Sequence, residues 1–423
     1  MNSTRTSRIS LVAIAIAAFT FSLAVRAQAQ TETVLYNFPG GSPGRFPVGG
    51  IVFDHAGNLY GTASSDGFAN CNTACGVVFE LSPTSGGWQQ TVLHTFSGGY
   101  DGGGPRASLV FDAAGNLYGT TQYGGGSSAC SNFGCGVVFE LSPTTSGTWQ
   151  ETILHSFGGG KDGKQPLSSL VFDAAGNLYG TTSQGGSTGC SSNGCGTVFE
   201  LSPTASGPWK ETLLRSFLGG SDGANPYAAV TFDAAGNLYG TTFMGGTSNN
   251  GVAYRLSPVS GRWQETILYR FQGSPDGYYP QSNLIFDAAG NLYGTTEYGG
   301  TGANGRGVVF ELSPTSGTAW KETRLRSLSN PIDGEYPLAA LVFDAAGNLW
   351  GTTSSSAFST GVVFELSPSS SGAWTQTTLP FTGTNGEKPL SGLVLDAAGN
   401  LYGTTELGGT GGTGYGVVFE ITP

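Results

Sequence analysis

The segment FDAAGNLYGTT at residues 111–121 decides the fold of this chain, because close copies of it return along the whole sequence. Three identical copies begin at Phe172, Phe232 and Phe286, and variants begin at Phe53 (FDHAGNLYGT), Phe343 (FDAAGNLWGTT) and Leu395 (LDAAGNLYGTT). The aspartates of the seven copies lie 52 to 61 residues apart. A repeat of this length indicates a modular domain in which each unit buries its apolar face against its neighbours.

Each repeat contains four short segments rich in Val, Ile, Phe, Tyr and Thr, which is typical of β-strands. In the second repeat the four segments are Leu109–Asp112, Asn116–Thr121, Gly136–Leu141 and Glu151–Phe157. No segment has helical periodicity long enough to compete with this pattern. The sequence therefore predicts an all-β fold with strands of about four to seven residues.

The turn inside the repeated segment explains why it is repeated. Asp-Ala-Ala-Gly fits a type I turn in which Asp accepts backbone hydrogen bonds and Gly adopts a positive φ. A ring of seven cation-binding carboxylates is the alternative for these aspartates. Because every repeat needs the same turn, we interpret them as turn formers.

Seven units of four antiparallel strands predict a seven-bladed β-propeller, since the coils of a β-helix are much shorter. The chain begins with a fourth-type strand at Glu32–Phe38 and ends with a third-type strand at Gly416–Ile421. We therefore expect residues 32–38 to be the outermost strand of the last blade and to pair with residues 416–421. This pairing would close the ring and remove a free sheet edge.

The first 29 residues are interpreted as a signal peptide. Arg5 and Arg8 precede an apolar run from Ile9 to Val25, and Ala27-Gln28-Ala29 fits a small-x-small cleavage site. An uncleaved membrane anchor is the alternative, but the run is at the short limit for a span. We expect a mature chain of residues 30–423 that forms one propeller, has no membrane span and is exported to the periplasm or the extracellular space.

The charge of the chain argues against several partners. Its formal net charge is −11, and removal of the three arginines in residues 1–29 makes it −14. An acidic surface repels phosphate backbones and anionic lipids, so a nucleic-acid partner is not expected. We expect the mature protein to be a monomer.

Taken together, the sub-motifs GVVFELSP, W-x-ETxLxxF, GGxDGxxP and LVFDAAGNLYGTT resemble the GloVer tandem repeats of exported bacterial "choice-of-anchor" proteins. The resemblance covers residues 31–423 and implies an exported repeat protein, although this chain shows no C-terminal sorting anchor. The D-x-x-G-N-L-Y core is also similar to NHL-type propeller blades. Neither resemblance supplies catalytic residues.

The six cysteines form three close pairs in the loops between the second and third strands of repeats one to three. The pairs are Cys71/Cys75, Cys130/Cys135 and Cys190/Cys195. An even count and an exported chain favour three local disulfides. Zinc is the alternative, but these loops contain no histidine, and we predict neither a metal site nor a cofactor.

Signals for catalysis are weak, and no catalytic residue is predicted. The chain has three histidines, His55, His94 and His155, and no nucleophile elbow, phosphate-binding loop or zinc-protease motif. His55 replaces an alanine in a turn. His94 and His155 occupy a fourth-strand position where other repeats have Tyr, Arg or Pro, and we expect them on the outer surface of the blades.

The loops that follow the fourth strands are the candidate binding site, because they should share one face with the cysteine loops and differ between blades. We interpret their Asp-Gly pairs first as turn formers. We interpret their tyrosines first as rings that cover the bases of the loops. The candidate binding residues are Tyr100, Asp101, Asp162, Asp222, Asp276, Tyr278, Tyr279, Asp333 and Tyr336. Exposed aromatics beside carboxylates suit a glycan or protein ligand.

Three function hypotheses follow from this pattern. The first is a non-enzymatic exported propeller that binds a polymer, either a glycan or a protein. The second is a propeller hydrolase or lyase that acts on carbohydrate or a lactone, which requires carboxylates, His or Arg to converge at the channel mouth. The third is a structural component of the cell surface.

The export and disulfide predictions can be checked on the secreted protein itself. We expect the intact mass to match a chain that begins at Gln30 and contains no free thiol. Thiol alkylation without reduction should add no mass. Six alkylated thiols, or a chain that retains residues 1–29, would contradict the two assignments.

Overall fold

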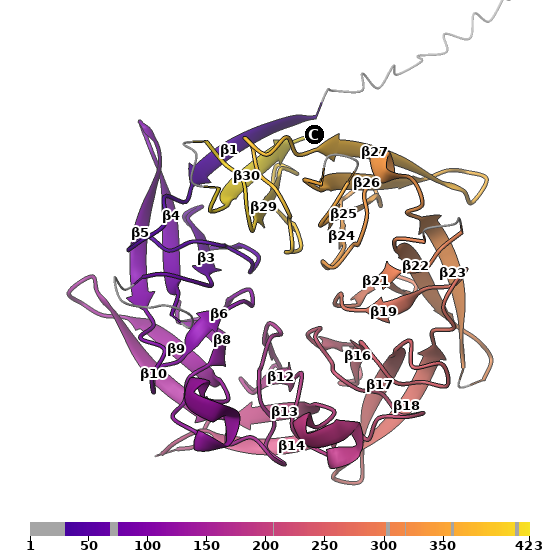
Figure 1. The fold of residues 1–423 in the computed structure, drawn as a ribbon, viewed down its shortest axis with the longest axis horizontal. Coiled ribbons are helices and arrows are strands. Elements are labelled where there is room, and N and C mark those ends of the chain that lie inside the picture. The colour runs from indigo at the N-terminus through magenta and orange to yellow at the C-terminus, as the bar shows by residue number, and fades with distance from the viewer. Residues whose placement is uncertain are drawn as a thin grey trace, which may run out of the picture.

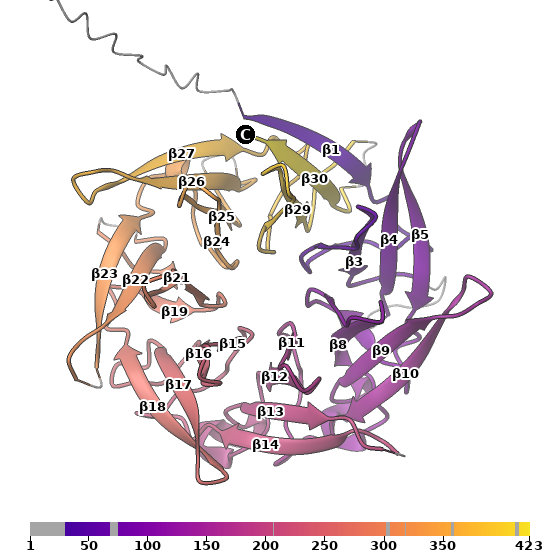
Figure 2. The same cartoon turned by 180° about the vertical axis from the view of Figure 1, so that it is seen from behind.

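A computed structural model describes residues 30–67, 75–205, 207–301, 305–317, 319–356, 359–410 and 414–423. Seven antiparallel sheets stand around a central axis and form a disc (Figure 1). The view from behind shows the same closed ring (Figure 2). The prediction of an all-β seven-bladed propeller is confirmed. The predicted signal peptide, residues 1–29, lies outside the described residues.

Each blade has four strands that are named here from the axis outward. Blade one consists of β2 (Val52–Phe53), β3 (Leu59–Ala63), β4 (Val77–Thr84) and β5 (Gly87–Thr95). Blade two consists of β7 (Val110–Phe111), β8 (Leu117–Tyr123), β9 (Val137–Pro143) and β10 (Trp149–Ser156). Blade three consists of β11 (Val171–Phe172), β12 (Leu178–Thr182), β13 (Thr197–Ser202) and β14 (Lys210–Ser216). Blade two has an additional short strand, β6 (Gly103–Pro105), which pairs with β8.

Blades four to seven repeat the pattern. They consist of β15 (Thr231–Phe232), β16 (Leu238–Thr242), β17 (Val252–Val259) and β18 (Arg262–Arg270); β20 (Ile285–Phe286), β21 (Leu292–Tyr298), β22 (Val308–Pro314) and β23 (Trp320–Ser327), with β19 (Tyr278–Pro280) beside β21; β24 (Val342–Phe343), β25 (Leu349–Thr353), β26 (Val362–Pro368) and β27 (Trp374–Pro380); and β28 (Val394–Leu395), β29 (Leu401–Thr405), β30 (Val417–Thr422) and β1 (Thr31–Asn37).

Within the described part of the chain, three short 3₁₀ helices lie in loops: η1 (Ser128–Phe133), η2 (Thr188–Asn193) and η3 (Pro331–Asp333). Among the described residues, no helix is long and apolar enough to cross a membrane.

The innermost strands are shorter than the sequence predicts, with two residues in place of at least four. Close to the axis, backbone and side-chain groups form hydrogen bonds with the neighbouring blade. They therefore do not lengthen the hydrogen-bonded strand pairing within their own sheet. The Gly50 amide, for example, donates to Ser108 Oγ at 2.9 Å, and the Ser108 amide donates to Ser169 Oγ at 3.1 Å.

The repeated aspartates form the predicted turns. Asp112 Oδ1 accepts hydrogen bonds from the amides of Ala114 and Asn116, both at 2.9 Å, and Oδ2 accepts from Asn116 Nδ2 and the Tyr118 hydroxyl. Burial raises the pKa of Asp112, but the hydrogen bonds together lower the pKa by more than burial raises it. The pKa of Asp112 therefore lies below its usual value. Equivalent bonds are made by Asp54, Asp173, Asp233, Asp287, Asp344 and Asp396.

A threonine in every repeated segment ties its blade to the next one. Thr120 Oγ1 donates to the Ser168 carbonyl at 3.2 Å, and Thr404 Oγ1 of the last blade donates to the Gly49 carbonyl of the first at 3.0 Å. The remaining five bonds run from Thr62 to Ala107, from Thr181 to Ala228, from Thr241 to Ser282, from Thr295 to Ala339 and from Thr352 to Ser391. The ring is therefore closed by hydrogen bonds near its axis.

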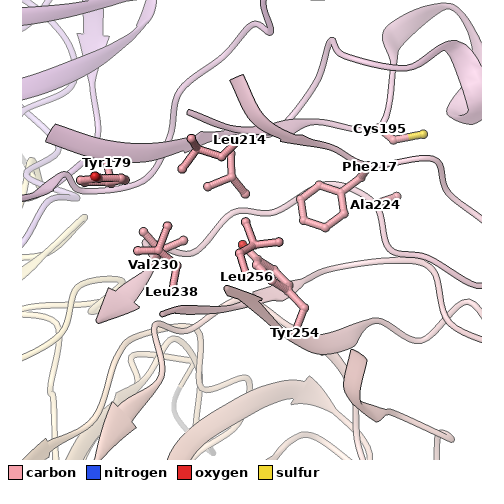
Figure 3. Packing of buried hydrophobic residues seen from close by; sticks show 10 residues of the cluster. Tyr179, Cys195, Leu214, Phe217, Ala224, Val230, Leu238, Tyr254 and Leu256 are labelled. Carbon is pink, nitrogen blue, oxygen red and sulfur yellow. The ribbon is translucent and has the colours of Figure 1, made fainter. Parts of the chain in front are cut away.

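The hydrophobic core lies between neighbouring blades. In one such core, Tyr179, Leu214 and Phe217 of blade three face Val230 and Leu256 of blade four (Figure 3). The repeated tryptophans join these cores as packing anchors. Trp149, Trp209, Trp263 and Trp320 pack at the edge of the preceding blade, each 6.1–6.4 Å from the ring of its repeated tyrosine.

The close packing explains the glycine of the repeated segment. A Cβ at Gly119 would lie 2.6 Å from Cζ of Phe139, which is fully buried. A larger residue at this position would displace a core phenylalanine.

The N-terminal strand completes the last blade as expected from the sequence. β1 pairs antiparallel with β30, from Thr31 opposite Thr422 to Asn37 opposite Val417 (Figure 1). The Phe38 amide then donates to the Gly416 carbonyl at 3.0 Å. Strands from the two ends of the chain thus share one sheet.

Glu32 in this closing strand makes stability depend on pH. Burial raises the pKa of its carboxyl to about 7, against the opposing effect of a hydrogen bond from Asn385. Folding raises this pKa, so the folded state holds the proton more tightly than the unfolded state. The contribution of Glu32 to the unfolding free energy is fully present below the unfolded pKa, near 4.5, and is lost as the pH rises through about 7.

Glu32→Gln keeps an oxygen that accepts the Asn385 hydrogen bond and removes the ionisation. Between about pH 5 and about pH 8, the wild type should lose about 1–2 kcal/mol more unfolding free energy than the variant, a value discounted for partial solvent contact. Urea unfolding at the two pH values measures this difference. An identical pH dependence of the two proteins would contradict the assignment.

Candidate functional site

A small cavity lies on the propeller axis. It has a volume of about 250 Å³ and is lined by residues from all seven blades. Small residues make up part of its lining: Gly50, Ser108, Ser169, Ala340 and Gly392. Among the described lining residues, Arg106, Tyr227 and Gln281 carry the long polar side chains. The cavity therefore offers hydrogen-bonding groups and one positive charge.

The residue that precedes the proline after each outer strand adopts a left-handed backbone. Tyr279 has a φ of 64° and Tyr336 a φ of 58°, which is uncommon for bulky residues. The equivalent residues are Phe46, Gly104, Gln165, Asn225 and Lys388. Each of the seven amides donates to a carbonyl of the preceding blade, for example Tyr336 N to the Arg306 carbonyl at 2.7 Å.

These inter-blade bonds account for the unusual φ, because the backbone of each residue is held from both sides of the blade junction. The conformation is a property of the framework, whereas the side chain differs from blade to blade. The seven positions, called here the rim ring, therefore place variable side chains around one end of the axis.

A continuous aromatic cluster extends from the axial cavity over blades four to six. Tyr227 packs on Phe243 with ring centroids 5.3 Å apart, and Phe243 stacks on Tyr279 at 4.4 Å. Tyr279 contacts Tyr278, which stacks on Tyr298 at 5.3 Å with an interplanar angle of 15°.

Tyr336 ends the series, with its ring centroid 5.2 Å from that of Tyr298. We name these six residues, Tyr227, Phe243, Tyr278, Tyr279, Tyr298 and Tyr336, the aromatic track. Every member retains partial solvent exposure.

Charged and amide groups flank the aromatic track. Arg306 forms an ion pair with Glu335, whose side chain is only 4 % exposed, and its guanidinium lies 5.9 Å from the centroid of Tyr336. Gln281 donates to Glu297 at 2.6 Å, and burial raises the pKa of Glu297 above its usual value. The track thus combines aromatic faces with hydrogen-bonding groups at its edge.

A smaller group lies on the other side of the ring. The Arg45 guanidinium lies 4.9 Å from the centroid of Phe46 and 5.6 Å from that of Tyr415, and it pairs with Asp66 at 3.3 Å. This group contains two aromatic rings, against the six of the aromatic track.

The structure brings three of the predicted binding residues together and separates the others from them. Tyr278, Tyr279 and Tyr336 belong to the aromatic track. Tyr100 does not, since it is 81 % exposed and packs near Gly126 in blade two.

The five predicted aspartates lie at the junctions between outer strands. At each junction three side-chain positions meet: a residue of the outer strand, the Asp of the following loop, and a Glu or Gln of the next outer strand. Arg215, for example, lies 2.5 Å from both Asp222 and Glu265. The other junctions with an aspartate contain Asp101, Asp162, Asp276 and Asp333.

The aspartates also shape their own loops. Asp222 Oδ2 accepts the amide of Leu218 at 2.6 Å, and Asp276 Oδ2 accepts that of Gln272 at 2.8 Å. These contacts agree with the structural reading of the Asp-Gly pairs.

The expected outer-surface placement of His94 and His155 is wrong. Their side chains are 18 % and 17 % exposed, because each ring is enclosed between its own loop and the next blade. His94 faces Glu151 at 3.6 Å, and His155 shares a hydrogen bond of 3.1 Å with Asp162.

Two of the predicted disulfides are present, Cys130–Cys135 and Cys190–Cys195. Cys75 is disulfide-bonded as well, whereas Cys71 lies outside the described residues. The bonded loops contain η1 and η2 and contact the loops that follow the outer strands, as the Gly125 amide does with the Gly99 carbonyl at 3.0 Å. The two loop types therefore share one face, as expected.

Sequence reasoning missed part of the site. Arg306, Gln281 and Glu297 were not among the predicted residues. Phe243 and Tyr298 come from another part of the repeat, at the end of the second strand. Alignment of the repeats at the residue before the conserved proline would have located the rim ring. It would not have shown that two loop types supply one aromatic track.

The repeat family described as Gloeobacter/Verrucomicrobia repeat matches residues 20–192 and 187–419. No curated protein matches the chain. A solved structure from Thermus thermophilus, described as a candidate oxidoreductase (glucose dehydrogenase), is similar with a TM-score of 0.44 and 15 % identity over 74 % of this chain and 95 % of that chain. A protein of unknown function from Dyadobacter fermentans has a TM-score of 0.43 and 13 % identity over 82 % of this chain and 96 % of its own.

The rim ring should tolerate exchange where the framework does not. Tyr279→Asn and Tyr336→Asn place at these positions the residue that blade four has at Asn225, and asparagine adopts a left-handed backbone more readily than tyrosine. We expect each variant to keep its unfolding free energy to within about 1 kcal/mol, because relief at the backbone offsets the lost ring contact.

Thr120→Val is the matched framework control. It should cost about 1–3 kcal/mol, because the Ser168 carbonyl loses its hydrogen-bond donor from the neighbouring blade. Urea unfolding of the three variants measures these values. A loss at the tyrosines as large as that at Thr120 would show that the rim residues are themselves structural.

Proposed function

The chain belongs to the Gloeobacter/Verrucomicrobia repeat family, and from this premise we propose that it is an exported, non-enzymatic β-propeller that binds a glycan polymer on the face carrying the aromatic track. The observation that carries the proposal is the track itself. Six partly exposed aromatic rings are in contact from the axial cavity to blade six, within a repeat whose framework needs none of them at these positions.

The chemistry of the track suits a sugar chain. The apolar faces of pyranose rings pack on aromatic side chains, while their hydroxyls need hydrogen-bonding partners at the edges of the rings. Arg306, Glu335, Gln281 and Glu297 supply such partners beside the track. Because the track crosses several blades, it suits several successive residues of a polymer.

Separate observations support the proposed location. Disulfides persist in oxidising compartments, and Cys130–Cys135 and Cys190–Cys195 are both formed. The proposed signal peptide would deliver the chain to the periplasm or the extracellular space. We propose that the mature protein acts there as a monomer.

The enzyme hypothesis receives no specific support from the described site. Arg106 and Tyr227 are the titratable side chains among the described residues that line the axial cavity, and they provide no nucleophile with an adjacent base. The candidate aspartates are engaged at the blade junctions. A protein ligand and a structural role at the cell surface remain as alternative outcomes of the binding test.

A glycan panel tests the proposal with variants that the repeat itself supplies. Tyr278→Ala introduces the residue that blade four has at Ala224, and Tyr279→Asn introduces the residue at Asn225, so both changes are compatible with the fold. Each should weaken binding of a captured glycan about tenfold, the effect of losing about 1.4 kcal/mol of ring contact.

Tyr100→Ala, outside the track, is the control and should bind like the wild type. Isothermal titration with the best glycan from the panel gives the dissociation constants. Retention of no glycan by the wild type, or equal affinity of all four proteins, would overturn the proposal. Consumption of a glycan or lactone during the assay would favour the enzyme hypothesis.

A further inference from the structure

The blade junctions carry chemistry that the binding face does not use. At the junction of blades one and two, His94 from β5, Asp101 from the following loop and Glu151 from β10 each present one ligand atom, and these atoms lie within 4.8 Å of one another. His94 Nε2 and Glu151 Oε1 are 3.6 Å apart. Three potential metal ligands thus converge from two blades.

Two of these three atoms have no hydrogen-bond partner. His94 Nε2 and Glu151 Oε1 are buried atoms that are unpaired among the described residues. Their side chains are 18 % and 13 % exposed. Asp101 is held in place, because Oδ2 accepts the Ser97 amide at 2.7 Å and Oδ1 bonds to the Ser97 hydroxyl. The equivalent glutamate oxygens of Glu211, Glu265 and Glu322 are unpaired too, so the buried nitrogen of His94 is what distinguishes this cluster. A buried nitrogen without a partner is costly, and a bound ion would supply one.

Other junctions of the same ring show what that partner is. Between blades three and four, the Arg215 guanidinium lies 2.5 Å from Asp222 and from Glu265. Arg215 occupies the strand position of His94, and the two carboxylates correspond to Asp101 and Glu151. Arg215 pairs with one oxygen of each carboxylate, although Glu265 Oε1 has no hydrogen-bond partner there. At the His94 junction, histidine takes the position of this guanidinium between the two carboxylates.

We propose that His94, Asp101 and Glu151 bind one divalent transition-metal ion, of the Zn²⁺ class, across the junction of blades one and two. One imidazole nitrogen and two carboxylate oxygens form a three-ligand set that Zn²⁺ accepts, with water in the fourth position. The ion would have the same position here as the Arg215 guanidinium has at the junction of blades three and four, and it would connect two neighbouring blades. It lies on the outer strands and is independent of the aromatic track.

A second cluster of the same composition lies one junction further on. His155, Asp162 and Glu211 also present ligand atoms within 4.8 Å of one another. There the imidazole already shares a hydrogen bond with Asp162, so the first cluster has the stronger case. The test must therefore separate the two.

The experiment uses the mature chain without an affinity tag, in the His155→Arg background, so that the second cluster carries a guanidinium as at Arg215. The protein is dialysed against a chelator and titrated with ZnCl₂ by calorimetry, and bound zinc is counted by mass spectrometry. We expect one ion per chain and a higher Tm with zinc. Adding His94→Arg should abolish both effects and leave the metal-free Tm unchanged or raised.

Two further variants keep the result interpretable. His55→Ala removes an exposed histidine from a turn and should bind zinc like its parent. Glu151→Gln keeps the shape of the side chain and should weaken binding at least tenfold, which gives a second reading if His94→Arg does not fold. Zinc-free parent protein, or equal binding by the parent and both cluster variants, would overturn the proposal.

Discussion

Contact between neighbouring blades is the constraint on which the whole structure depends. The hydrophobic cores lie between blades: Phe139, Phe199 and their equivalents are buried against the sheet of the preceding blade. The threonine of each repeated segment adds a hydrogen bond to the following blade, and Thr404 of the last blade donates to the Gly49 carbonyl of the first and completes the ring. In a closed ring every blade needs four strands and two neighbouring blades. The last blade obtains its outermost strand from the N-terminal segment, because β1 pairs with β30.

The sequence was sufficient to predict this framework, since every framework residue is repeated. The Asp112 turn, the axial serines and glycines, the tryptophan anchors and the role of residues 32–38 all follow from comparing one repeat with the next. The length of the inner strands could not be predicted in the same way. Their apolar residues are typical of longer strands. The geometry at the axis, which the sequence does not show, places their backbone groups within hydrogen-bond distance of the neighbouring blade.

The candidate site was predicted only in part, because it consists of the residues that do not repeat. Tyr278, Tyr279 and Tyr336 could be named from their loops, but their assembly with Phe243 and Tyr298 depends on how two loop types approach one another. The junction clusters show the same limit. His94 looked like a surface residue because its position tolerates exchange, whereas histidine, arginine and tyrosine at this position all face carboxylates of the blade junction.

Hydrogen exchange of the closing strand tests the central claim most directly. If the ring is held by blade-to-blade contact and closed by β1, the β1 amides bonded to β30 should exchange as slowly as the amides that pair β30 with β29, through global unfolding alone. Mass spectrometry of peptides covering residues 31–37 and 417–422 measures both rates. Exchange of the 31–37 peptide within seconds, beside a protected 417–422 peptide, would contradict the account.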